Sequence, residues 1–348
     1  MSKVINQHYV PQSYLKNFSL HNSQVFVFDK LNQKIFPSHV KNVASSRFFN
    51  DFPENTTQLK KIQMMEELYS QLEMKQNRFL RHIKKKINKI LDLKFHPNNS
   101  EKVYLTNILT VDQRNDLACI TAIQFLRTKE FRKFLFEIQQ NQVTKTLINE
   151  ILEQEAFNFI KQFQFIDDMQ FNANLFDWIK DFIVQQSTTN IDFIYKDCLS
   201  VVHAKFILTY YDKVANIFNN HIWTIGINNT EQPLFTSDNP VVRHSHLSSS
   251  GIASEGIEIV CPLDGKLILI MKDKLFFNEY IDRNNRLISL TSDDVDYYNS
   301  LQLYNSNRQI FCSQNMFKLA REICQQKPEV CSQNINRLQI RITDTQSD

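Results

Sequence analysis

Glycine is absent from the first 225 residues of this chain, since its four glycines are Gly226, Gly251, Gly256 and Gly265. A phosphate-binding loop or a dinucleotide-binding turn needs glycine, because its backbone must approach the phosphates without an intervening Cβ. Both designs are therefore excluded from these 225 residues. The chain also lacks G-x-S-x-G, H-E-x-x-H and protein-kinase signatures, which excludes the commonest hydrolase and kinase designs.

The middle of the chain has a helical pattern. From Thr57 to Leu93, apolar residues recur mostly at spacings of three and four, which predicts an amphipathic helix. Asn99 or Ser100 is a candidate N-cap after this helix ends. A second long helix is expected over 112–137, and further helices over 142–166, 173–186 and 192–217. Neither glycine nor proline occurs between residues 98 and 225, which favours a continuous helical block over 57–217.

At both ends of the chain, apolar and polar residues instead alternate with a period of two. The segments QVFVFDK and LNQKIFPSHV predict a hairpin near the N-terminus. After about residue 220, HIWTIGIN, PLFTSDNPVV and GIEIVCPLDGKLILIMK predict three or four strands, and LTSDDVDYY begins a helix that leads to a short strand. The predicted fold class is α+β, with a small, mostly antiparallel sheet built from both chain ends around a large helical insertion.

This pattern predicts one composite domain over residues 1–331, followed by a polar tail over 332–348. Within the domain, N-terminal strands occupy 1–56, the helical block 57–217, and C-terminal strands with a helix 218–331. Because the domain draws its sheet from both ends, we expect it to fold as a single unit.

Bulk composition excludes some classes of protein and location. The 348 residues are 42% hydrophobic and 22% charged, which is typical of a chain with a buried core. No run of about 18 apolar residues occurs, and the first residues show no secretory signal, so we expect no membrane span and a cytoplasmic location. Six widely spread cysteines without C-x-x-C spacing give no zinc-ribbon or thioredoxin motif, and no disulfide framework is expected.

Two short motifs lie near opposite ends of the chain. The first is His8-Tyr9-Val10-Pro11-Gln12, and the second is Thr236-Ser237-Asp238-Asn239-Pro240-Val241. With the VFVFDK hairpin, the KNVA segment at 41–44 and the Ile257-Glu258-Ile259 strand, they resemble the bacterial domain-of-unknown-function family 4238 over about residues 5 to 275. This chain has Asp264-Gly265 where the family more often has serine. The resemblance supplies a family but no mechanism.

His8 is the first candidate catalytic residue, because an imidazole titrates near neutrality and suits proton transfer or metal binding. Its neighbour Tyr9 is a candidate substrate contact. The alternative is that both side chains pack at the mouth of the hairpin, with the imidazole bonded to backbone.

Asp238 and Asn239 are candidate catalytic residues at the end of a predicted strand, with Ser237 as a substrate contact. A carboxylate there could orient the His8 imidazole and fix its tautomer. The alternative is a structural turn, because Asp-Asn-Pro is a strong turn former.

Arg127 and Lys41 are candidate anion contacts. Arg127 interrupts an otherwise apolar helix face, which indicates either a phosphate contact or an internal salt bridge with Glu66, Glu67 or another acid. The family resemblance also implies an arginine at this point. Lys41 precedes the KNVA segment and could contact an anionic substrate.

A basic stretch over 81–89 is a candidate nucleic-acid contact through Lys84, Lys85 and Lys86, the alternative being a solvated helix face. His244 and His246 alternate and would lie on one side of a strand, where a metal could bind. Neighbouring serines and a glycine favour an exposed loop instead, so we predict no metal site. The sequence identifies no cofactor.

Two functions follow as hypotheses. The first is an enzyme acting on a phosphate-bearing substrate such as nucleic acid, with a defence or toxin-like role by analogy only. It requires His8, Asp238 and Arg127 to converge in one cleft. The second is a non-catalytic interaction module in which both motifs are structural. The oligomeric state cannot be derived from the sequence, and the net charge of +3 permits a nucleic-acid partner without arguing for one.

Overall fold

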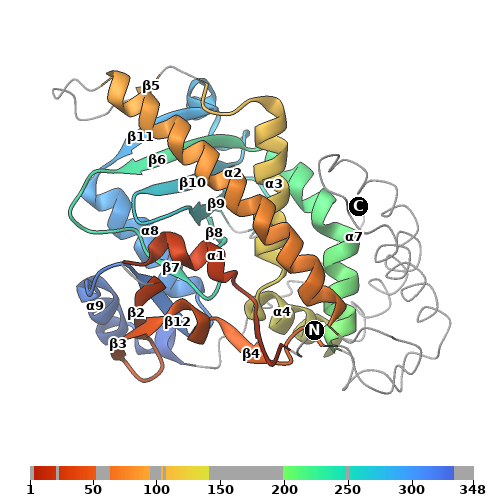
Figure 1. The fold of residues 1–348 in the computed structure, drawn as a ribbon. Helices are drawn as coiled ribbons and strands as arrows, with labels where there is room; N and C mark the ends of the chain where they lie inside the picture. Colours follow the sequence, from red (N-terminus) through yellow and green to blue (C-terminus); the bar gives the residue numbers. More distant parts are fainter. Residues whose placement is uncertain are drawn as a thin grey trace, which may run out of the picture.

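The residues that the structure describes form three sheets and the helices that cover them (Figure 1). The computed structural model describes residues 4–20, 23–51, 63–94, 103–104, 107–140, 199–247, 249 and 251–332. Helices lie between the N-terminal and C-terminal strands in the chain, and most strand pairs are antiparallel. The predicted α+β fold class is therefore confirmed. Among the described helices, none has the length and apolar character needed to cross a bilayer.

A four-stranded sheet joins the two ends of the chain, as predicted. Its order is β3-β2-β12-β7, with bounds Lys34–His39, Gln24–Asp29, Gln309–Cys312 and Thr236–Ser237. The N-terminal hairpin β2–β3 pairs through β2 with the C-terminal strand β12, which in turn pairs with β7. The second sequence motif therefore begins inside a sheet that contains the N-terminal hairpin.

A six-stranded sheet forms the second layer, in the order β5-β11-β6-β10-β9-β8. The strands span Val103–Tyr104, Arg286–Leu290, Ile222–Asn228, Leu267–Lys272, Ile257–Pro262 and Val242–Ser245. Only the β11–β6 pair is parallel among these strands. Gly226 lies at a close approach within the sheet, because a Cβ there would lie 2.8 Å from Leu290 Cδ2. β8 is an edge strand.

Alternating side chains give this sheet two apolar faces. One face packs against the helices α2, α3 and α7, which span Met64–Lys94, Val111–Leu126 and Leu199–Asn219. The other face packs against α8, Ser292–Asn305, through Val242, Val260, Ile268 and Ile270. In Figure 1 the long helix α2 crosses in front of the strands, while α3 and α7 lie side by side next to it.

The first motif lies on a small two-stranded sheet. β1, Asn6–His8, pairs with β4, Ser45–Arg47, and α1, Gln12–Leu15, follows directly. Val10, Tyr14, Leu15 and Phe18 are fully or almost fully buried in the main core. The N-terminal segment is therefore fixed by apolar burial as well as by strand pairing.

The prediction of a single helix over 112–137 is wrong, because the helix is interrupted at Arg127 and Thr128. α3 ends at Leu126, and α4 runs over Lys129–Gln140. The Thr128 hydroxyl accepts a hydrogen bond from the Phe131 amide at 3.1 Å, which caps the new helix. α3 itself starts from a capping box between Thr110 and Gln113.

Other parts of the expected pattern lie partly outside the described residues. The helices predicted over 142–166 and 173–186, the start of the helix predicted from residue 192 and most of the polar tail fall there, as do Asn99 and Ser100 with their predicted helix start. The predicted 57–93 helix is described from Met64 onward, and the helix ending near 217 is α7. Strand β11 and helix α9, Lys318–Gln326, were not predicted.

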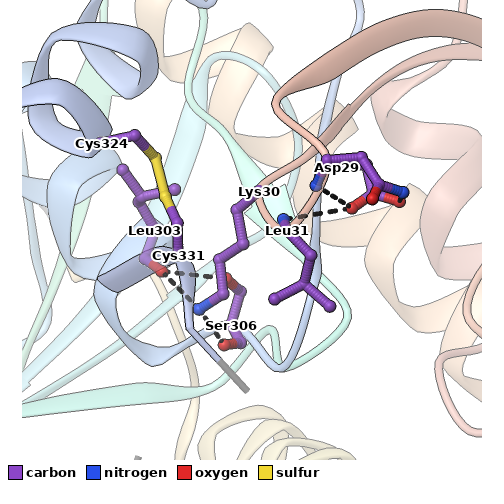
Figure 2. The surroundings of a disulfide bond; sticks show 8 residues. Asp29, Lys30, Leu31, Leu303, Ser306, Cys324 and Cys331 are labelled. Atoms are coloured by element: carbon purple, nitrogen blue, oxygen red, sulfur yellow. Dashed lines mark hydrogen bonds between the residues drawn. A yellow bond between two sulfur atoms is a disulfide. The ribbon is translucent and has the colours of Figure 1, made fainter. Parts of the chain in front are cut away.

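A single disulfide joins Cys324 to Cys331, although the sequence predicts no disulfide framework (Figure 2). It joins α9 to the short 3₁₀ helix η7, Pro328–Cys331, with the two Cα atoms 6.1 Å apart. The two cysteines are only seven positions apart in the chain, and the turn between α9 and η7 brings them together. Widely spaced cysteines elsewhere in the sequence gave no signal for this local pair.

Lys30, at the end of β2, is a buried lysine next to this region (Figure 2). Its side chain is fully buried, and its ammonium donates to the carbonyl oxygens of Ser306 at 2.6 Å and Leu303 at 3.4 Å. These carbonyls lie at the C-terminal end of α8, where the helix dipole favours a positive charge. Lys30 therefore couples the N-terminal hairpin to the end of α8.

We predict that Lys30→Met lowers the free energy of unfolding by about 1.5–3 kcal/mol, the usual range for hydrogen bonds to a charged group. Urea unfolding followed by circular dichroism measures the change. Lys34→Met, at an exposed position on the same hairpin, is the matched control and should leave the free energy of unfolding nearly unchanged. Equal stability of the Lys30 and Lys34 variants would contradict a coupling role for Lys30.

Candidate functional site

The Ser-Asp-Asn-Pro turn is built around the carboxylate of Asp238. This side chain is only 1% exposed, and its two oxygens accept hydrogen bonds from three consecutive backbone amides. The distances are 2.8 Å to Asn307 N, 2.8 Å to Arg308 N and 3.0 Å to Gln309 N. Burial raises the pKa of Asp238, and these amides with the nearby Lys30 charge act in the opposite direction. The carboxylate thus fixes the connection between α8 and β12.

Ser237 and Asn239 complete the turn from either side of Asp238. The Ser237 hydroxyl lies 2.8 Å from Gln302 Oε1 and accepts from the Asn239 amide at 3.2 Å. The Asn239 side chain donates through Nδ2 to the carbonyl of Asn305 at 2.9 Å. Asp238 and Ser237 are engaged internally, whereas Asn239 and Val241 of the motif line a cavity.

That cavity is a pocket of about 300 Å³ between the α3–α4 break, the start of β8 and the end of α8. Its wall contains aromatic rings, polar groups of the turn and strand, and one arginine: Phe125, Glu130, Phe131, Phe134, Asn239, Val241, Val242, Arg243, Ser245, Tyr304, Asn305 and Ser306. Because α3 and α4 are separate helices, Phe125 at the end of α3 and the first residues of α4 line different parts of the pocket wall.

Arg243 is the charged group that distinguishes this pocket. In the part of the chain that the structure describes, its guanidinium has no carboxylate and no hydrogen-bond partner, and it lies 5.9 Å from the centroid of the Phe125 ring. Burial lowers the pKa of Arg243. Because a half-buried guanidinium without partners is costly, Arg243 is a candidate anion contact.

Glu130 is the acidic side chain of the pocket wall. Its Oε2 accepts from Asn307 Nδ2 at 2.9 Å, so this carboxylate is engaged at the wall. It nevertheless adds a negative charge to the pocket and opposes the binding of an anion. The balance between Glu130 and Arg243 can therefore be tested by removing either charge.

His8 and Arg127 meet, but not in this pocket. Arg127 is 3% exposed, and its Nη2 donates to the His8 carbonyl at 2.9 Å and contacts Glu73 Oε1 at 3.1 Å. Its guanidinium also lies over the Tyr69 ring at 4.0 Å. Of the alternatives for Arg127, these contacts favour the internal salt bridge, with Glu73 as the acid.

The His8 imidazole is half-buried, and burial lowers its pKa. Its Nδ1 lies 3.4 Å from Gln12 Nε2, while its Nε2 is buried without a hydrogen-bond partner among the described residues. Tyr9 is buried against Phe49 at 5.2 Å between ring centroids, and burial together with the Asp238 charge raises its pKa. The carboxylate of Asp238 bonds to the 307–309 amides rather than to His8.

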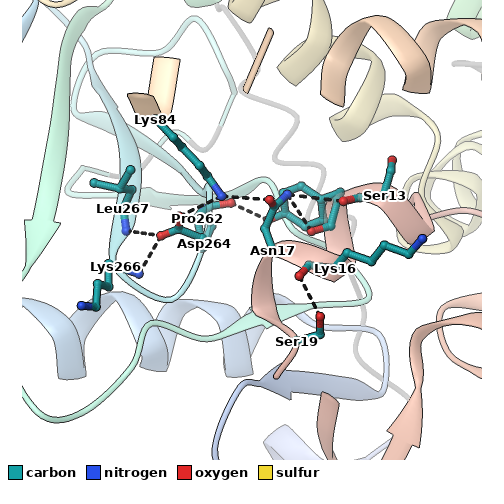
Figure 3. Close-up of polar contacts among 10 residues, drawn as sticks. Ser13, Lys16, Asn17, Ser19, Lys84, Pro262, Asp264, Lys266 and Leu267 are labelled. Carbon is teal, nitrogen blue, oxygen red and sulfur yellow. Dashed lines mark hydrogen bonds and ion pairs between the residues drawn. The ribbon is translucent and has the colours of Figure 1, made fainter. Parts of the chain in front are cut away.

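The lysines predicted from the sequence differ in their exposure and contacts. Lys41 is exposed, and its backbone N–H donates a hydrogen bond to Nδ1 of the His39 imidazole. Lys84 forms an ion pair with Asp264 at 2.8 Å and donates to Asn17 Oδ1 at 2.8 Å, as Figure 3 shows. Lys85 is exposed and Lys86 is half-buried. Lys84 therefore ties α2 to the β9–β10 turn.

Sequence reasoning missed Arg243 and the aromatic wall. The available signal was an arginine directly after two valines in VVRHSH, which marks a charge within a strand. A second missed residue is Glu258, a buried acid in the apolar strand IEIVCP. Arg243 and Glu258 are both charged residues within apolar strands, and a buried charge needs a partner.

We predict that Asp238→Asn destabilises the fold by about 1–3 kcal/mol, because an amide cannot accept from all three backbone donors and leaves buried N–H groups unpaired. Thermal and urea unfolding measure the change, with the exposed Asp282→Asn as the control. A fully stable Asp238→Asn protein would contradict the structural role and would favour a role for this carboxylate in catalysis.

Comparison with known proteins identifies one family. The family described as "Protein of unknown function (DUF4238)" matches residues 6–315, which include both motifs and the whole pocket. No curated protein and no solved structure matches the chain.

Proposed function

The chain belongs to the DUF4238 family of proteins of unknown function, and from its pocket we propose that it binds a small phosphate-bearing ligand with a flat ring. The observation that carries the proposal is the Arg243 guanidinium, which lines the pocket without a partner among the described residues. A ligand phosphate would supply the charge-assisted hydrogen bonds that the protein leaves open.

The polar part of the wall suits a phosphate. A guanidinium offers planar, paired N–H donors that match phosphate oxygens. Arg243 and Ser245 lie two residues apart on β8, so their side chains project to the same face of the sheet. Asn239, held in place by the Asp238 turn, adds an amide group at the same wall.

The apolar part of the wall suits a ring. Phe125, Phe131, Phe134 and Tyr304 all line the pocket, and aromatic faces stack on flat ligands such as nucleobases. A volume of about 300 Å³ is at the lower end of the range for small-molecule sites, which typically run from about 300 to 1,000 Å³. A mononucleotide therefore fits the chemistry of the site better than a long nucleic-acid duplex.

This proposal keeps the phosphate-bearing ligand expected from the sequence and moves the anion contact from Arg127 and Lys41 to Arg243. The two motifs then act by positioning, as the interaction-module hypothesis assumed, because Asp238 fixes the turn and Arg127 fixes the His8 carbonyl. Turnover of the ligand by His8, nuclease activity, a defence role and a cytoplasmic location stay predictions from the sequence.

The test uses the four ribonucleoside monophosphates, their nucleosides and inorganic phosphate as probes, with calorimetric titration and thermal shift as measurements. We expect at least one monophosphate to bind more tightly than its nucleoside. Arg243→Met should weaken that binding by about 10- to 100-fold, as loss of a charge-assisted hydrogen bond predicts. Glu130→Gln should strengthen it by removing the opposing charge.

Arg321→Met, at an exposed arginine on α9, is the matched control and should bind like the unmodified protein. The proposal fails if no monophosphate binds better than its nucleoside, or if the Arg243 variant binds with unchanged affinity.

A further inference from the structure

A second polar cluster lies on the opposite face of β8 from Arg243. In the strand register, His244 on β8 and Lys272 on β10 both stand directly opposite Glu258 on β9. Directly opposite residues on neighbouring strands project to the same face, so these three form one row across the sheet. His246 follows His244 by two positions and bonds to Glu258 at the same row. The row faces α8, which supplies two tyrosines.

Glu258 is the buried centre of this cluster. Its side chain is 1% exposed, and it accepts from four groups: His246 Nε2 at 3.1 Å, Tyr297 OH at 3.0 Å, Tyr298 OH at 3.2 Å and Lys272 Nζ at 3.3 Å. Burial alone would raise the pKa of Glu258, but the Lys272 charge and the other donors outweigh it and lower the pKa. Glu258 is therefore a carboxylate that holds its neighbours in fixed positions.

His246 is held by this carboxylate through one ring nitrogen. Because Nε2 donates to Glu258, the neutral imidazole carries its lone pair on Nδ1, which has no hydrogen-bond partner among the described residues. The side chain is 30% exposed, so solutes can reach it. An imidazole held by a carboxylate through one nitrogen, with the other free, is the arrangement found around metal-binding histidines.

His244 completes a pair with His246. The two ring centroids are 4.7 Å apart, with the rings nearly perpendicular at 85°. In the described part of the chain, neither nitrogen of His244 has a hydrogen-bond partner, and the ring also lies 6.0 Å from that of Tyr297.

We propose that His244 and His246 bind a divalent transition-metal ion of the zinc class, with Glu258 as the residue that positions His246. Imidazole nitrogens suit zinc, copper and nickel rather than magnesium or calcium. The described residues contain no group of three or more His, Cys, Asp or Glu side chains placed to hold a metal ion. The proposed site therefore has two protein ligands, and its remaining coordination positions would be taken by water or a bound solute.

This site reverses the absence of a metal expected from the sequence, where the neighbouring serines favoured an exposed loop. It is independent of the proposed nucleotide pocket, because Arg243 and Ser245 project to the other face of β8. Either proposal can fail while the other stands.

The test is a calorimetric titration of the full chain with zinc, after removal of any affinity tag, at neutral pH. We expect a single zinc ion to bind per chain. Glu258→Gln should weaken zinc binding by about 10- to 100-fold, because it removes the carboxylate that positions His246. His244→Ala and His246→Ala should each weaken zinc binding by more than this. The exposed His82→Ala on α2 is the matched control and should bind zinc normally.

His244→Ala is the decisive variant, because His244 makes no hydrogen bond that the fold needs, and circular dichroism should show it folded. Zinc affinity that is unchanged in folded His244→Ala would overturn the site, and so would the absence of saturable binding to the unmodified chain. Unchanged zinc affinity in a folded Glu258→Gln protein would overturn the positioning role of Glu258.

Discussion

The Asp238 carboxylate and the three amides of residues 307–309 form the contact on which the surrounding architecture depends. In this one place the exit from β7, the end of α8 and the start of β12 meet. Asp29, at the end of β2, joins them through an ion pair with Arg308 at 2.6 Å, and Lys30 caps the end of α8. A single buried anion thus organises backbone donors that a loop would otherwise leave unpaired.

The site proposed for a ligand follows from this anchor. Because Asp238 and Ser237 are used inside the protein, the chain leaves the turn with Asn239 at a fixed point of the pocket and enters β8 directly afterwards. β8 is the edge of the six-stranded sheet, and its alternating side chains project to both faces. β8 and the residue after it therefore carry both Arg243 and the histidine pair, and the pleat of the strand places them on opposite faces of the sheet.

Much of the fold could be predicted from the sequence, because patterning with a period of two or of about 3.6 follows from burying one side of an element. The hairpin at 24–39, the long helix before residue 94 and the union of both chain ends in one sheet follow from such patterns. The α3–α4 break was not predictable in this way, because no glycine or proline marks it in the sequence. The second helix is instead capped by a single hydroxyl, that of Thr128.

The site was harder to predict than the fold. Sequence motifs indicated Asp238 and Asn239 but could not show that the carboxylate would be occupied by backbone amides from residues about 70 positions away. The arginine in VVRHSH indicates a charge within a strand, but its lack of a partner is a property of the folded chain. Glu258 similarly gains its role from four donors, which lie on α8, on β10 and at the residue after β8.

Amide hydrogen exchange at single-residue resolution tests the central anchor most directly. If Asp238 accepts from the backbone as described, the amides of Asn307, Arg308 and Gln309 exchange as slowly as those of residues 310–312 in β12, although Arg308 is an exposed residue. Exchange of all three at the rate of an unprotected loop would contradict the account, because the carboxylate would then be free for another role.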